Sequence, residues 1–202
     1  MSEPLSDLRG RLRAIQQEIE QELEAQQARW RYRIHEGRVH FEAQTRDAHR
    51  RLRQSLLRFL RESSIGNLLT APVIYSLFVP LLIADVWISL YQRVCFPIYG
   101  IPRVRRRDYL VVDRHRLGYL NAIEKANCAY CSYANGLFAY LREISARTEQ
   151  YWCPIRHARP LRDPHPHYPA FVEYGDAEGY HRRLPMLRST WTEPPKPEEP
   201  RR

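Results

Sequence analysis

An apolar run between Glu62 and Arg93 constrains this 202-residue chain more than any other feature, because it contains a single charged side chain, Asp85. A helix of roughly 20 apolar residues is long enough to cross the hydrocarbon core of a bilayer. The run therefore predicts a membrane-inserted segment, which we place at 64–100. The rest of the chain is rich in charged residues and prolines.

Two topologies fit this run. In one, a single helix over about 68–90 crosses the membrane with a kink near Pro80, because proline has no amide hydrogen and clashes with the preceding turn. In the other, a re-entrant helical hairpin breaks near Pro80 and both of its ends lie on the same side. A single span predicts an asymmetry of arginine and lysine between its flanks, whereas the two flanks here are nearly balanced. This balance favours the hairpin, and Pro72 and Pro97 add further interruptions.

Asp85 has two interpretations, since a carboxylate inside a membrane is costly and often functional. It could form an ion, proton or ligand site. Alternatively, it lies near the second interface, beside Gln92 and Arg93 about two helical turns away, and snorkels or pairs there. We favour the second interpretation, because the run holds no second charge that could form a relay.

Basic residues surround the membrane segment, and the formal net charge of the chain is +9. Nucleic acid binds such charge, but juxtamembrane arginines also bind anionic lipid headgroups at about 1 kcal/mol each. Their position beside the apolar run favours lipid, so we expect a bilayer with anionic headgroups as a partner and not nucleic acid. The flanking arginines are Arg50, Arg51, Arg53, Arg58, Arg61, Arg93, Arg103, Arg105, Arg106 and Arg107.

Residues 1–63 are predicted to form a helical arm. Leu5, Leu8, Leu12, Ile15 and Ile19 alternate steps of three and four, the spacing of a coiled-coil seam. The arm is therefore expected to associate with itself or with a protein partner; the alternative is a helix that lies on the membrane or packs on its own C-terminal domain. Between 30 and 41 the apolar residues also alternate as in a β-hairpin, but the longer helical period continues through this stretch and favours helix.

Residues 101–157 are predicted to form a helical pair. Asp113 can cap a first helix over Arg114–Ala126, and a turn at Asn135–Gly136 leads into a second helix that ends near Gln150. The fold class expected for the whole chain is therefore mostly α, with a long N-terminal helical arm, a membrane-inserted helix or re-entrant helical hairpin, and a C-terminal helical pair.

This pair carries a set of candidate metal ligands, Cys128, Cys131, Cys153 and His157, spaced C-x2-C-x21-C-x3-H. Three thiolates and one imidazole suit a tetrahedral structural zinc site. A continuous helix over 132–150 would, however, be about 28 Å long and would separate the two halves. One chain closes the site only if the turn at Asn135–Gly136 shortens that helix or the helix breaks near its end. Otherwise the second pair of ligands comes from another protomer.

Two alternatives to zinc stay open. Cys128 and Cys131 have the spacing of a dithiol redox protein, and a thiol just before a helix has a lowered pKa; iron or an iron–sulfur cluster would serve the same role. Otherwise the cysteines simply pack among tyrosines. Asp113, His115, Asn121 and Glu124 offer acid and base groups, yet such residues more often cap a helix, and the sequence indicates no reaction. Cys95 is a candidate for palmitoylation.

The tail, 158–202, is rich in proline and is expected to be partly disordered, from about Thr192 onward. His165 and His167 fall in it as loop residues or, at best, an accessory metal site. Phe171–Tyr174 could form a short strand or simply lie over the helical pair. At the other end, residues 1–27 lack the apolar core of a cleavable signal peptide, so 64–100 is expected to direct insertion.

The sequences Asn127-Cys128-Ala-Tyr-Cys131 and Ala146-Arg-Thr-Glu-Gln-Tyr-Trp-Cys153-Pro-Ile-Arg-His157 resemble those of an uncharacterised family of small bacterial membrane proteins. The resemblance covers roughly 68–157. It implies a bacterial inner (plasma) membrane, and it implies neither an activity nor a fold. The balance of basic residues between the two flanks indicates that the soluble parts lie in the cytoplasm. The function expected from the whole sequence is an assembly or interaction module at the membrane surface, with a structural Cys/His metal site; the alternative is a membrane-bound dithiol redox protein.

Overall fold

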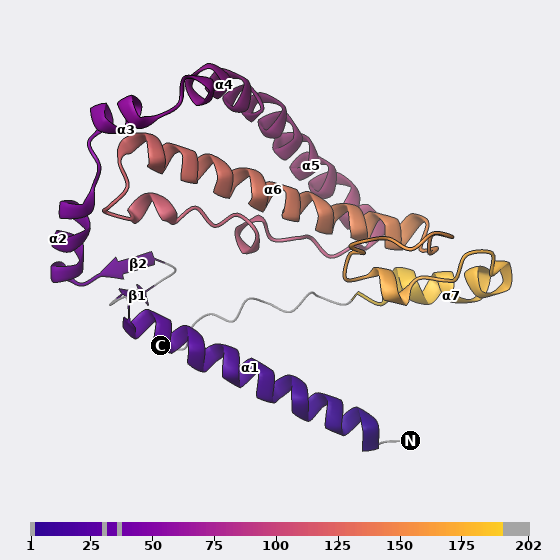
Figure 1. Ribbon diagram of the computed structural model, residues 1–202. Helices are drawn as coiled ribbons and strands as arrows, with labels where there is room; N and C mark the ends of the chain where they lie inside the picture. Colours follow the sequence, from indigo (N-terminus) through magenta and orange to yellow (C-terminus); the bar gives the residue numbers. More distant parts are fainter. Residues whose placement is uncertain (1–2, 30–31, 36–37, 192–202) are drawn as a thin grey trace.

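The computed structural model describes residues 3–29, 32–35 and 38–191, and it is mostly helical, as predicted (Figure 1). Three short 3-10 turns lie at 106–108, 114–116 and 168–170. The regular elements in chain order are α1 (Glu3–Arg29), β1 (Tyr32–His35), β2 (Arg38–Phe41), α2 (Ala43–Leu52), α3 (Leu56–Glu62), α4 (Ile65–Ser76), α5 (Phe78–Tyr99), α6 (Ala122–Trp152) and α7 (Ala177–Ser189).

The predicted N-terminal arm is not one long helix. It begins with α1 as expected, but β1 and β2 then form an antiparallel hairpin in which Tyr32 pairs with Phe41 and Ile34 pairs with Val39. The preference for helix over 30–41 was therefore wrong. In the sequence these four apolar residues alternate with polar or charged ones, which is the pattern of a strand, and a glycine in the same stretch disfavours a helix.

The apolar run forms one bent helix, α4–α5, that extends over Ile65–Tyr99. The bend lies at Leu77, whose backbone keeps helical dihedral angles, φ −62° and ψ −17°. Pro80 follows three residues later and offers no amide hydrogen to the Ser76 carbonyl. The helix therefore kinks without turning back, and the re-entrant hairpin that we favoured was wrong. It ends at Gly100, whose φ of 68° is left-handed and lets Ile101 N–H donate to the Phe96 carbonyl.

The predicted pair of C-terminal helices is instead the single helix α6, 31 residues long. Asn121 begins it with a capping box, in which its side chain accepts from Glu124 N–H and the Glu124 carboxylate accepts from Asn121 N–H. The helix expected from Asp113 is only the 3-10 turn at 114–116. Gly136 lies inside α6 because the preceding segment packs on it there: an added Cβ would lie 2.6 Å from the Tyr109 carbonyl oxygen.

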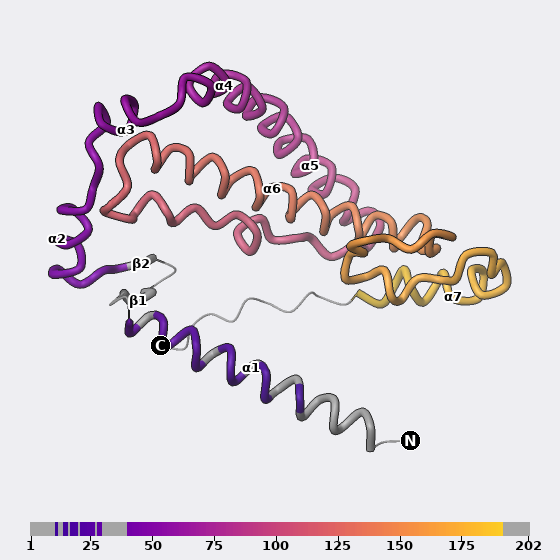
Figure 2. The backbone as a smooth tube through the Cα atoms, in the orientation of Figure 1, coloured from indigo at the N-terminus to yellow at the C-terminus, as the bar shows by residue number. Residues whose placement is uncertain are grey.

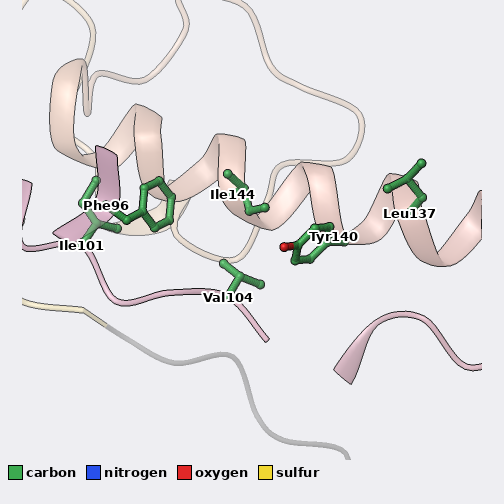
Figure 3. Close-up of a cluster of buried hydrophobic side chains, with 6 residues drawn as sticks. All are labelled: Phe96, Ile101, Val104, Leu137, Tyr140 and Ile144. Carbon is green, nitrogen blue, oxygen red and sulfur yellow. The ribbon is translucent and has the colours of Figure 1, made fainter. Parts of the chain in front are cut away.

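The core forms where α5, the segment 101–104 and α6 meet (Figure 3). After α5 the chain runs back along α6 through 101–121, as Figure 2 shows, before α6 itself begins. This path places the loop side chains against both helices. The buried apolar residues of this core are Phe96, Ile101, Val104, Leu137, Tyr140 and Ile144.

The C-terminal part covers the far end of α6. Gln150 donates from Nε2 to the carbonyls of Leu187 and Thr190, which holds α7 against α6. The strand expected at Phe171–Tyr174 is reduced to one bridge between Val172 and Ile155. The disorder predicted from about Thr192 falls outside the described residues.

Candidate functional site

The outer side of α4–α5 is a continuous apolar surface that the rest of the chain leaves exposed. Trp87 is 71% exposed and Ile98 is 75% exposed. Soluble monomers rarely expose contiguous apolar patches larger than a few hundred Å². By length and composition, Ile65–Tyr99 is a helix able to cross a membrane. We call the following exposed side chains the apolar face: Ile65, Leu68, Leu69, Val73, Ile74, Leu77, Val79, Leu82, Ile83, Val86, Trp87, Leu90, Val94 and Ile98.

The inner side of α5 carries the polar residues, and Asp85 is the centre of one group. Its carboxylate accepts from the Arg106 guanidinium at 2.6 Å, from the Tyr133 hydroxyl at 2.9 Å and from the Ser89 hydroxyl at 3.5 Å. The hydrogen bond with Asp85 holds the pKa of Arg106 above its ordinary value. Asp85 is thus paired, as one of the two interpretations had it, but the ion pair joins α5 to the loop that follows it and does not involve the neighbouring Arg93.

Gln92 forms a second polar link, one that sequence reasoning missed. Its side-chain amide donates to the Val104 carbonyl at 3.3 Å, and its oxygen accepts from Val104 N–H at 3.1 Å. The same amide contacts the Tyr140 hydroxyl of α6. One buried glutamine thus connects α5, the loop and α6. In the sequence, this contact was indicated only by the presence of a polar residue at the end of an apolar run.

A buried ionic cluster lies on α6, again unforeseen. Glu143 accepts from Arg147 Nε at 2.7 Å and contacts His167 Nε2 at 3.0 Å, while Arg147 also donates to the Pro102 carbonyl at 2.7 Å. All three side chains are almost fully buried. Burial alone would raise the pKa of Glu143, but the hydrogen bonds from His167 and Arg147 outweigh it and hold that pKa below its usual range.

His165 lies beside this cluster and pairs with Glu149, at 3.0 Å from Nε2 to the carboxylate. Its Nδ1 is buried and has no hydrogen-bond partner among the described residues. Burial lowers the pKa of His165, against the opposing pull of Glu149. The neutral imidazole of His165 is therefore favoured at neutral pH. Through their contacts with Glu149 and Glu143, His165 and His167 hold this part of the tail on α6.

The four predicted metal ligands do not come together within one chain. Cys128 and Cys131 lie in the first turns of α6, whereas Cys153 follows its last residue, about 33 Å along the helix axis from Cys131. No group of three or more histidine, cysteine or acidic side chains able to hold a metal occurs in the part of the chain that the structure describes. Because α6 is unbroken at Gly136, only the arrangement with a second protomer remains for this set.

The surroundings of Cys131, Cys153 and His157 also disfavour metal binding or thiol reactivity in a single chain. Burial and the charge of Glu149 raise the pKa of the Cys153 thiol, which disfavours the thiolate. His157 stacks on Tyr168 and contacts its hydroxyl. Cys131 is exposed and lies within α6, not before its first turn, so the helix-dipole argument for a reactive thiol does not apply. Asn121 and Glu124, considered above as acid and base groups, form the capping box instead.

Comparison of the chain with family models, curated proteins and solved structures finds no match.

Proposed function

We propose that this protein is a helical interaction module held at a membrane surface by the apolar face of α4–α5. The observation that carries the proposal is the exposure of that face along the whole helix, from Ile65 to Ile98. Burying a large aliphatic or aromatic side chain is worth about 1.5–3 kcal/mol. Transfer of the half-exposed side chains of this face into lipid therefore supplies on the order of 10 kcal/mol, enough for stable attachment.

The basic residues near this helix support an anionic membrane as the partner. Arg93, Arg103, Arg105 and Arg107 are exposed on α5 and on the segment that follows it. Arginine side chains at this position can reach headgroup phosphates, and each contributes about 1 kcal/mol near an anionic surface. Apolar insertion and charge thus act on the same bilayer.

The partner-binding part of the module is the N-terminal arm. Ile15, Ile19 and Leu23 lie on α1 and are about half exposed, at 54%, 55% and 51%. Steps of four along a helix place these side chains on one face. This stripe supports self-association, or binding of a protein partner with a matching helix, at the membrane surface.

A metal shared between two copies would reinforce that assembly. Of the four predicted ligands, Cys153 has a disfavoured thiolate and His157 contacts Tyr168, so we place the shared metal on the other pair of each copy. Cys128 and Cys131 lie one turn apart on α6, and two such pairs supply the four thiolates of a tetrahedral zinc site. Because the same spacing also permits a disulfide between the two thiols, the dithiol redox protein is the second candidate function.

Membrane fractionation and size in detergent test the proposal together. The full-length chain should stay with the membranes through a high-salt wash and leave them only with detergent, because apolar burial is insensitive to screening. In mild detergent it should be larger than one chain, and the Ile15→Asp/Ile19→Asp variant should shift to the monomer. A Gln17→Asp variant on the same helix is the matched control. Release of the wild-type chain by salt alone would refute membrane insertion, and equal sizes for all three chains would refute assembly through α1.

A further inference from the structure

We propose that α4–α5 lies in the plane of one leaflet of an anionic bilayer, with α6 and the segment 101–121 on its aqueous side. This inference rests on the proposed membrane attachment and specifies its geometry. The helix would then be an interfacial helix and would not cross the bilayer. One of its sides faces lipid, and its other side is covered by the rest of the folded chain.

The two sides of α5 differ in the way that such an arrangement needs. Successive helical residues are rotated by about 100°, which places Ile83, Trp87 and Val94 on the side opposite Asp85 and Gln92. The first three are exposed and apolar, and the last two are buried against the loop and α6. The sequence of α5 is mostly apolar, and its polar residues Asp85 and Gln92 lie on the side where the loop and α6 pack.

The polar side is covered along the whole of α5. Just before α5, Tyr75 in the last turn of α4 contacts Asn127 and Tyr130 of α6, and at the other end Tyr99 stacks on Tyr151. The stretch 75–99 corresponds to about 36 Å of helix axis, more than the roughly 30 Å of a hydrocarbon core. If α5 crossed the bilayer, α6 would therefore have to cross beside it.

The segment 101–121 is the strongest argument against crossing. Its irregular backbone is held against the middle of α5 and α6 by the Asp85–Arg106 ion pair and by the packing of Leu110 on Gly136. The Arg106 side chain is still 49% exposed. Asp85 lies about 21 Å along the helix from Tyr99, so an upright helix would carry this arginine deep into hydrocarbon. Irregular backbone and charge are not tolerated against lipid.

The length of the apolar face leads to the same conclusion. From Ile65 to Ile98 it extends for about 50 Å, so an upright helix would leave roughly 20 Å of it outside the hydrocarbon. A helix in the plane buries all of it at one depth. Arg93 and the exposed arginines at 103, 105 and 107 then border the leaflet and can reach its phosphates.

Depth measurements on the full-length chain test this geometry. The chain is bound to vesicles of 70% zwitterionic and 30% anionic phospholipid, with Trp87 as the sole tryptophan after replacement of the other three by Phe. Two further variants move that tryptophan to Leu69 or to Val79. Quenching by lipids brominated at successive acyl positions reports the depth of each ring. In-plane insertion predicts the same shallow depth, within the outer half of the leaflet, for all three.

Cys131 gives an independent readout from the exposed side of α6. With the other cysteines changed to Ser, a membrane-impermeant maleimide should modify it equally fast in vesicle-bound and detergent-solubilised protein. A tryptophan depth that rises to a maximum at the bilayer centre, or a tenfold slower reaction of Cys131 in vesicles, would overturn the in-plane geometry while leaving membrane attachment intact. No association with the vesicles at all would refute the proposed function as well.

Discussion

Gly136→Ala is the substitution for which local helix propensity and the fold predict opposite signs. Gly136 lies within α6, and alanine in place of glycine stabilises an exposed helix interior by about 1 kcal/mol. In the structure, however, the new Cβ would lie 2.6 Å from the Tyr109 carbonyl oxygen, 3.0 Å from Leu110 Cα and 3.3 Å from Leu110 Cγ. Two of these three atoms are backbone, so the segment 101–110 must move.

Such overpacking typically costs about 1–3 kcal/mol. After the gain in helix propensity, we expect a net destabilisation of about 1 kcal/mol, measured as a lower midpoint of thermal unfolding in mild detergent. Gly66→Ala in α4 is the matched control, because its Cβ would meet only the Ser64 hydroxyl at 3.9 Å; it should be neutral or stabilising. An increase in stability for Gly136→Ala of the size expected from propensity would refute the packing of the loop on α6.

Three further predictions concern charge, pH and metal. Arg106→Gln should destabilise the fold by about 1 kcal/mol, a value that allows for solvent screening of the half-exposed guanidinium. Arg93→Gln should leave the stability unchanged. Equal midpoints of chemical denaturation for the two variants would contradict the ion pair. The lowered pKa values of His165 and Glu143 mean that the unfolded chain binds more protons than the folded one at acid pH. Stability should therefore fall as the pH drops below about 6.5 and again below about 4.3, and His165→Gln should remove only the upper step; a midpoint of unfolding that does not change between pH 7 and 5 would contradict this. If two copies share zinc, elemental analysis should find about one zinc per two chains. The zinc should be lost in Cys131→Ser and retained in Cys153→Ser. Loss of zinc in both variants would instead indicate a site that includes Cys153 and His157.

The elements that could be predicted are those whose signal is a uniform composition or a clear period. The apolar run gave the helix over 65–99, and the steps of three and four before Ile19 gave α1. At 30–41 the apolar residues fit both a helical and a strand period. The structure has a hairpin there, because β1 and β2 pair with each other, and the apolar pattern alone does not decide between the two. Asn and Gly in succession are typical of a turn, which is why a turn was predicted at Asn135–Gly136. In the structure Gly136 lies within a continuous helix, and it lacks a side chain because Leu110 packs closely against its backbone.

Side-chain partners could not be predicted, because they depend on contacts between distant segments. Asp85 was identified as unusual, but sequence proximity offered only its neighbours Gln92 and Arg93. Its partner Arg106 is positioned by the return of the loop. The cysteine and histidine spacing suits a zinc site only if the helix between its halves breaks. The continuity of α6, fixed by packing at Gly136, separates those halves.

Partition of the full-length chain between water and anionic vesicles tests the central claim, attachment through the apolar face, most directly. Ile83→Lys/Val86→Lys places two charges in that face, and Ser145→Lys places one on the exposed side of α6. Each substitution removes an aliphatic side chain whose transfer into lipid is worth about 1.5 kcal/mol or more, before the cost of inserting the charge is added. The face variant should therefore bind at least about 100-fold more weakly than wild type, while Ser145→Lys binds as well or better. Equal binding of all three proteins would contradict attachment through this face.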